Sequence, residues 1–300
     1  MAHALSRVSW VTLALAASAF SFNLFLKAYR WQRLLLAQGI ALPASESLAA
    51  YLSGQFYAQV TLGRVGEFFR AEALLARGVS AGRALASCVF DRLLDVTIVF
   101  GLGAVFATLV LGDRTLALLA LGVWLALVIT VGALLRFAVP VAPGTDANTL
   151  QVWLGALESR RFIGRLVRGF RELLAAMLPM LRLAPLSEAL LWSGLSWFGY
   201  FQALFQLADG LHLAVSRVLL TATAAFAALS ALLPITVSGL GARELIYIQV
   251  LENHGVESET AVVLSLLHLL IMSVSATLFG FVGVLWRQRQ RARSTTPVAS

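Results

Sequence analysis

A small set of charged residues lies inside otherwise apolar stretches of this chain, and these residues are the ones that could do chemistry. They fall in three short segments and comprise Arg64, Glu67, Arg70, Glu72, Asp91, Arg92, Asp95, Arg243 and Glu244. An arginine can hold a phosphate through two parallel hydrogen bonds, and a carboxylate can pair with the arginine or carry a proton. These residue types therefore predict a polar site for a charged group.

Glycines accompany the charges in two similar motifs. Gly63 and Gly66 precede Glu67 in the first motif, and Pro234, Gly239 and Gly241 precede Glu244 in the second; we predict that these five residues act as hinges. A shift of 177 residues superposes Glu67 on Glu244, Gly78-Val79 on Gly255-Val256, and Leu52 on Leu229. The shared register indicates a two-fold internal repeat. Chance matching in a chain rich in leucine and alanine is the alternative.

The composition is that of a membrane protein. The chain has 300 residues, of which 59% are hydrophobic and 13% charged, whereas a soluble domain carries about a quarter charged residues. Several apolar runs reach the ~20 residues that a helix needs to cross a bilayer. They are too long and too apolar for barrel strands. We therefore predict an all-α, polytopic helical membrane protein.

The charge balance and the cysteine count exclude other classes. The net charge of +8 comes almost entirely from arginine, since Lys27 is the only lysine. These arginines lie beside hydrophobic segments, where topology and anionic headgroups explain them better than nucleic acid does. Lys27, Arg30 and Arg33 are interpreted as a basic collar after the first span. Cys88 is single and the four histidines are scattered, so we expect no metal site, and the sequence indicates no cofactor.

The expected elements follow from the apolar runs and their breaks. Full spans are predicted at 8–26, 89–111, 116–139, 186–208 and 261–286, and short broken hairpins at 45–77 and 218–251. Within 140–185, an amphipathic helix over 150–178 either lies in the headgroup plane or packs on the bundle as a linker. A basic, disordered tail is expected over 287–300.

The distribution of arginines predicts the topology. Arginine-rich stretches at 158–182 and after 286 should be cytoplasmic, and the acidic loop at 252–260 should face outward. The C-terminus is then cytoplasmic and the N-terminus outside. The hairpins enter from opposite sides, which makes the repeat an inverted one. We expect a single membrane domain with repeat one at about 8–111, a linker span and cytoplasmic segment between, and repeat two at about 186–286.

Inverted repeats with interrupted helices are a recurrent plan of transporters. A helix that stops within the membrane presents free N–H groups that can hold an anion, and its broken backbone is tolerated only beside protein or a wet cavity. The charged residues thus predict a binding site between the hairpins. Two alternatives stay open: the charges could simply neutralise one another and fix the hairpins, or shallow hairpins could leave them at the interface.

These motifs resemble a known family. Gly63–Arg70, Gly78, Asp91-Arg92 and Asp95 look like the first signature of the lysylphosphatidylglycerol synthase transmembrane-domain family, the flippase-like integral membrane proteins. The segment from Pro234 to Glu244 is similar to its second signature, with Ser238 where a glycine is usual. The similarity covers about residues 8–286.

The resemblance implies a multi-pass protein of the bacterial inner (plasma) membrane that works in lipid transport. Its expected role is a lipid translocase for an anionic phospholipid or a polyprenyl- or hopanoid-type lipid. Such a role predicts that Arg64, Glu67, Arg70, Asp91, Arg92, Asp95, Arg243 and Glu244 bind the substrate. Since the chain ends seven residues after Arg293, we expect no aminoacyl-transferase domain of the kind found in some relatives, and no lipid aminoacylation by this chain alone.

Two other functions are weighed against translocation. An enzyme could use Glu67 or Asp91 as a general base, although no nucleophile–base pair or nucleotide-binding loop accompanies them, so we expect a protein that is not an enzyme. A non-catalytic accessory subunit could dock a lipid-synthesis or glycosyltransferase partner on 140–185. Without an ATP-binding motif, transport would be passive or coupled to a gradient.

Overall fold

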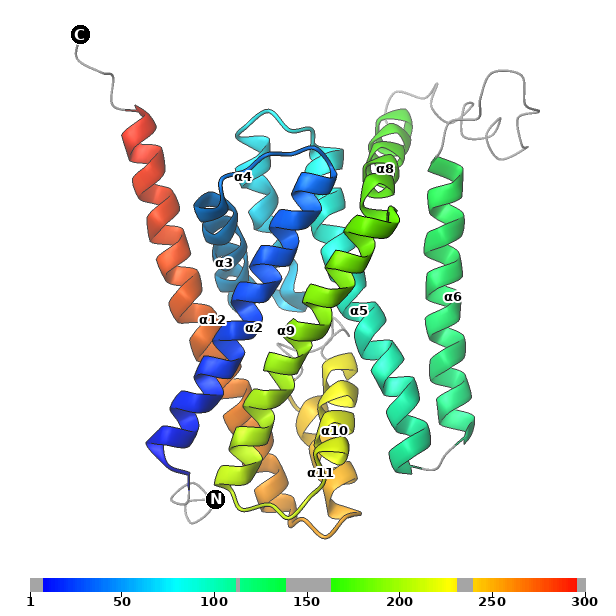
Figure 1. Cartoon of the computed structure of the whole chain (residues 1–300), viewed down its shortest axis with the longest axis vertical. Coiled ribbons are helices and arrows are strands. Elements are labelled where there is room, and N and C mark those ends of the chain that lie inside the picture. The colour runs from blue at the N-terminus through cyan, green and yellow to red at the C-terminus, as the bar shows by residue number, and fades with distance from the viewer. Residues whose placement is uncertain (1–7, 112–113, 139–162, 231–239, 296–300) are drawn as a thin grey trace.

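The computed structural model describes residues 8–111, 114–138, 163–230 and 240–295 (Figure 1). Within these ranges the chain forms helices and their connections, without a strand. The predicted all-α fold is confirmed. By length and composition, α2 (Trp10–Ala37) and the apolar part of α12 (Ser258–Thr295) can each cross a membrane. The segment 164–181 and α9 (Leu183–Gly210) pass the same test together, bent by 84° at their junction.

Helices α2 and α9 run in opposite directions through the centre of the molecule and pack along their length (Figure 1). Their contact is close because Gly199 has no side chain: a Cβ there would lie 2.9 Å from the Ala19 carbonyl oxygen. Phe20 and Leu24 of α2 and Leu204 of α9 belong to the apolar core between them. This pair forms the axis around which the other elements are arranged.

The two broken hairpins lie toward opposite ends of the molecule (Figure 1). The first consists of α3 (Ala44–Val60), the 3-10 helix η1 (Leu62–Ala71) and the short α4 (Glu72–Leu75). The second consists of α10 (Arg217–Ser230) and α11 (Ala242–Glu252), joined through a segment outside the described residues. With α2 and α9 antiparallel, this arrangement is the predicted inverted one.

The same turn closes both hairpins. Gly78 and Gly255 both adopt positive φ, 77° and 81°, and their N–H groups donate to Leu75 and Glu252, each at 3.0 Å. The following valines also donate to equivalent leucines, Val79 to Leu74 and Val256 to Leu251, each at 3.1 Å. Both turns have the glycine-terminated form common at helix ends, which needs a residue without Cβ strain. The 177-residue register read from the sequence thus has a structural counterpart.

Each hairpin packs against the terminal long helix of the other repeat. A Cβ at Gly280 of α12 would lie 2.7 Å from the Leu52 carbonyl oxygen of α3. A Cβ at Gly103 of α5 (Ala81–Leu111) would lie 3.2 Å from Leu229 of α10. Gly103 with Gly280 and Leu52 with Leu229 are again 177 residues apart. The repeats are therefore interlocked rather than side by side.

The remaining helices surround this unit. Helix α6 (Arg114–Ala138) packs on α5, and α8 (Ile163–Met177) packs on α5 and α6 before the 3-10 helix η2 (Leu178–Leu181) leads into α9. Leu174 and Met177 of α8 are buried against Phe90 and Leu94 of α5, which agrees with a linker helix packed on the bundle. The first part of the predicted amphipathic helix, 150–162, lies outside the described residues.

Several predicted boundaries were wrong. The first span does not end at Leu26, since α2 continues to Ala37. Helix α5 begins at Ala81, so Asp91 lies almost three turns inside it and not at its start. Helix α12 runs past 286 to Thr295, so the tail predicted to be disordered from 287 is helical up to that residue. In each case an apolar count located the hydrophobic part of a helix whose backbone hydrogen bonds extend into polar sequence.

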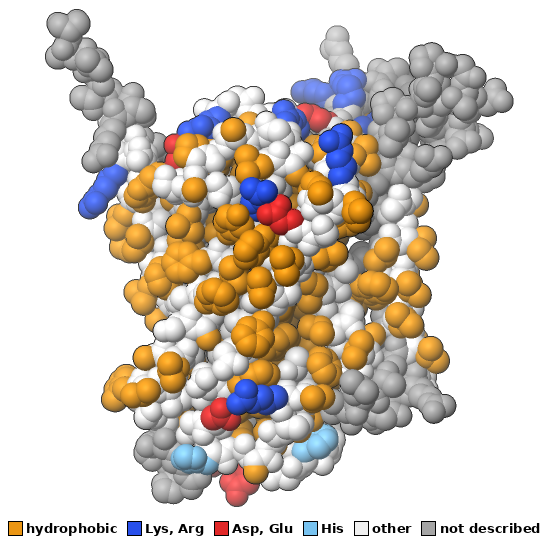
Figure 2. Space-filling model, viewed as in Figure 1, with side chains coloured by type: hydrophobic (Ala, Val, Ile, Leu, Met, Phe, Trp, Pro, Cys, Tyr) orange, Lys and Arg blue, Asp and Glu red, His pale blue; other side chains and the backbone are white. Residues whose placement is uncertain are grey.

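The surface agrees with a protein embedded in a membrane. Figure 2 shows hydrophobic side chains over the middle of one face, with charged side chains gathered toward the two ends. Large apolar side chains such as Leu118, Ile129, Phe198 and Leu278 are more than half exposed. Such exposure is unfavourable in water and ordinary against lipid.

Candidate functional site

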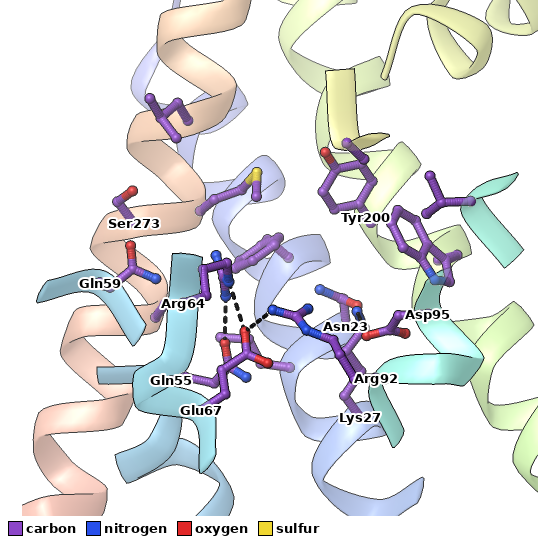
Figure 3. Close-up of a pocket in the computed structure, with 18 of the residues that line it drawn as sticks. Asn23, Lys27, Gln55, Gln59, Arg64, Glu67, Arg92, Asp95, Tyr200 and Ser273 are labelled. Atoms are coloured by element: carbon purple, nitrogen blue, oxygen red, sulfur yellow. Dashed lines mark hydrogen bonds and ion pairs between the residues drawn. The ribbon is translucent and has the colours of Figure 1, made fainter. Parts of the chain in front are cut away.

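A partly open cavity lies between the two hairpins and the long helices (Figure 3), with about 1030 Å³ of space that no atom fills. Charged and amide side chains form one part of its wall: Lys27, Gln55, Gln59, Arg64, Glu67, Arg92, Asp95 and Arg243. Apolar and aromatic side chains form the rest, among them Leu24, Val99, Trp197, Tyr200 and Leu269. The cavity is amphipathic.

Glu67 of η1 holds two arginines at the polar wall (Figure 3). Arg64 Nε donates to Glu67 Oε1 at 2.7 Å and Arg92 Nη2 donates to the same oxygen at 2.9 Å. Arg64 also donates to Gln55 Oε1 at 3.0 Å, which ties η1 to α3. One carboxylate thus serves two guanidinium groups, and the cluster keeps a positive excess.

The shape of η1 brings Glu67 and Arg64 together. Gly66 packs against the α3 backbone so closely that a Cβ would lie 2.2 Å from the Tyr57 carbonyl carbon. Its N–H donates to Thr61 Oγ1 at 2.8 Å, and Arg64 adopts a positive φ of 57°. The chain therefore folds back on α3 with Arg64 and Glu67 one 3-10 turn apart, on the same side of η1.

A second, deeper chain of ion pairs links α2, α5 and η1. Arg30 Nε donates to Asp91 Oδ1 at 2.8 Å and Arg30 Nη1 to Asp95 Oδ1 at 2.9 Å. Lys27 pairs with the other oxygen of Asp95 at 2.9 Å, and Arg70 pairs with Asp91 Oδ2 at 2.9 Å. Three cations share two carboxylates, and Arg30 is completely buried. Only the Lys27–Asp95 end of this chain reaches the cavity.

Arg243 enters the cavity from α11 at the other hairpin. Its Nη2 lies 2.8 Å from His268 Nδ1, and its Nε donates to Ser265 Oγ at 3.2 Å. Tyr247 also bonds His268 Nδ1, at 3.2 Å. The contact between Tyr247 and His268 occupies the same repeat positions as that between Arg70 and Asp91, since both pairs differ by 177 residues. His268 is a packed hydrogen-bonding residue, as expected.

The structure brings most of the predicted site residues together, though not all of them into the cavity. Of the eight, five line it: Arg64, Glu67, Arg92, Asp95 and Arg243. Arg70 and Asp91 lie behind this wall in the buried ion-pair chain. Glu244 does not line the cavity; its carboxylate accepts from the Gly241 N–H at 2.5 Å and from Ser265 at 3.2 Å, so it caps its own helix.

The predicted hinges are placed unevenly. Gly63 and Gly66 lie within η1 as expected at a break between helices. Gly241 precedes α11 with φ of 88°, a backbone that side chains other than glycine rarely adopt. Pro234 and Gly239 lie outside the described residues.

The main residues that the sequence analysis missed are Arg30 and the aromatic wall. Arg30 was interpreted as part of an interfacial collar, and this was wrong because α2 turns that face toward Asp91 and Asp95. A signal was present: Lys27 and Arg30 lie on one side of a helix, as do Asp91 and Asp95, so two helices could pair by charge. Arg33 is the member that reaches the surface, where it pairs with Glu188 at 2.6 Å.

Trp197 and Tyr200 face the cavity from α9, and Asn23 and Tyr51 face it from α2 and α3. Their types gave no signal, since aromatic residues are frequent throughout this span. In the described part of the chain, no group of three or more His, Cys, Asp or Glu side chains is arranged to hold a metal ion.

The helices, the apolar surface and the interlocked hairpins around a charged cavity define a polytopic α-helical membrane protein of the inverted-repeat type. A family model described as the lysylphosphatidylglycerol synthase TM region matches residues 1–280. The chain therefore belongs to that family. No match was found among curated proteins.

Proposed function

We propose that this chain is a lipid translocase, which moves a phospholipid or a lipid-linked intermediate between the leaflets of the membrane. The carrying observation is one amphipathic cavity lined from both hairpins and from α2, α5, α9 and α12. A lipid needs both kinds of wall, since its headgroup loses water while its chains stay in an apolar phase. The charged wall can replace headgroup hydration, and the apolar wall can accept the glycerol and upper chains.

The proposed role requires no change in the lipid's covalent structure. The ion pairs around Glu67 would bind and release a headgroup as the hairpins move, which is the plan of transporters with broken helices at the repeat interface. We further propose the bacterial inner membrane as the location, with the arginine-rich end of α12 on the cytoplasmic side.

Reconstitution tests the proposal. Purified protein in liposomes should speed the loss of outer-and-inner leaflet asymmetry of a fluorescent phospholipid, measured by a reductant that does not cross the bilayer. Glu67→Gln leaves Arg64 and Arg92 without their shared carboxylate, so the rate should fall about tenfold or more, the loss expected from one strong polar contact.

Glu257→Gln is the matched control, because Glu257 is exposed in the loop after α11 and lies outside the cavity. Its rate should equal that of the unchanged protein. If protein that elutes as a single folded species leaves lipid exchange at the rate of empty liposomes, translocation is rejected.

A further inference from the structure

The buried charges around the cavity do not balance. Six cations take part in its wall or in the ion-pair chain behind it: Lys27, Arg30, Arg64, Arg70, Arg92 and Arg243. The carboxylates among them are Glu67, Asp91 and Asp95, and each of the three is already shared by two cations. Even with Glu244, which caps its own helix, positive charge is in excess.

Arg243 is where the excess is most clearly placed. Its residue is 4% exposed and lines the cavity, yet no carboxylate of the described residues lies within ion-pair distance of it. Its nearest partners are neutral: Ser265, the ring of Tyr247 at 5.5 Å, and His268, whose Nδ1 must be unprotonated to accept from the guanidinium. The undescribed segment 231–239 nearby contains no ionisable side chain.

A buried cation without a counter-charge is unfavourable in a membrane, so a ligand that supplies a negative charge would bind more strongly than one that does not. A guanidinium suits phosphate best, because its N–H groups match two phosphate oxygens. A zwitterionic headgroup would bring its own cation into a cavity that already has too many.

We propose that the cavity selects lipids with a net negative phosphate headgroup, and that Arg243, facing the Arg64–Arg92 pair across the same cavity, is the residue that reads the phosphate. This inference rests on the proposed translocase function and adds the class of substrate.

Two probes with identical chains and fluorophore test it in liposomes of one composition: a phosphatidylglycerol and a phosphatidylcholine. The anionic probe should cross at least about tenfold faster, as expected where a like charge is excluded from a buried site. Equal rates, or a faster zwitterionic probe, would overturn the selectivity and leave translocation standing. Movement of neither probe would overturn both.

Arg243→Gln tests the assigned residue. The ratio of the two rates should collapse toward one, because only the anionic probe loses its counter-charge, and the ratio does not depend on how much protein is folded. A proportional loss of both rates would show that Arg243 only supports the fold and would contradict its role. Arg217→Gln is the control: this arginine is 63% exposed, pairs with Asp209 at 3.6 Å, and should leave the ratio unchanged.

A further arm separates lipid phosphate from free phosphate. Inorganic phosphate at millimolar concentration should leave movement of the anionic probe unchanged, because it gains nothing from the apolar wall. Full inhibition at that concentration would contradict a lipid-specific site.

Discussion

Arg30 joins the two carboxylates of α5 to the centre of the bundle, and it shows how this chain tolerates charge inside a membrane. It donates to Asp91, to Asp95 and to Ser193 Oγ at 2.7 Å, so that its guanidinium meets acceptors on two other helices. Removing one member of a buried pair is costly because the partner stays behind without a counter-charge.

Arg30→Gln should therefore lower the free energy of unfolding by about 3–5 kcal/mol, the range for broken buried pairs. Thermal unfolding of the purified protein in detergent measures it. Arg33→Gln is the comparison, since Arg33 is 40% exposed and surface pairs contribute at most about 1 kcal/mol. Equal melting temperatures for the two variants would show that the buried chain is not what holds α2 on α5.

Gly66 gives a second test at the residue scale. Gly66→Ala forces a Cβ to within 2.2 Å of the Tyr57 backbone, so η1 must move away from α3, with a loss of about 1–3 kcal/mol as for overpacked sites. Gly169→Ala in α8 meets no atom within 4 Å and should be neutral or stabilise by up to about 1 kcal/mol. Melting curves of both variants decide; a neutral Gly66→Ala would mean that η1 is not pressed on α3.

At the scale of elements, the crossing of α3 with α12 holds the first hairpin in place. Gly280→Val would push α12 off the Leu52 carbonyl, and about 1–3 kcal/mol of stability should be lost. Gly101→Val on α5 meets no atom within 4 Å and serves as the control. A greater loss in the Gly101 variant would contradict the interlocked packing.

The hairpins could be predicted from sequence because their signals are local. Gly78 and Gly255 end helices at equivalent positions, and a left-handed turn needs glycine whatever surrounds it. The ion-pair chain could not be predicted, because it depends on which face of α2 meets α5, and one sequence does not reveal the rotation of packed helices. For the same reason Glu67 and Glu244 looked equivalent, while the structure gives the first to arginines and the second to a helix cap.

At the scale of the whole molecule, α2 begins at the end of the bundle opposite to where α12 finishes (Figure 1). The chain termini should then lie on opposite sides of the membrane, with the C-terminal side cytoplasmic. Reporter fusions at each end, active on only one side of the membrane, check this. The N-terminal fusion should report outside and the C-terminal one inside; two reports from the same side would contradict the inverted topology.

The central claim is that a lipid enters the cavity between the two hairpins. The most direct measurement uses a photoactivatable phosphatidylglycerol in liposomes containing the protein, followed by mapping of the adducts by mass spectrometry. Adducts are predicted at cavity residues such as Trp197, Tyr200 and Met272, and they should decrease when unlabelled phosphatidylglycerol is added. Adducts confined to outward-facing residues, such as Leu118 and Leu119 of α6, would contradict the account.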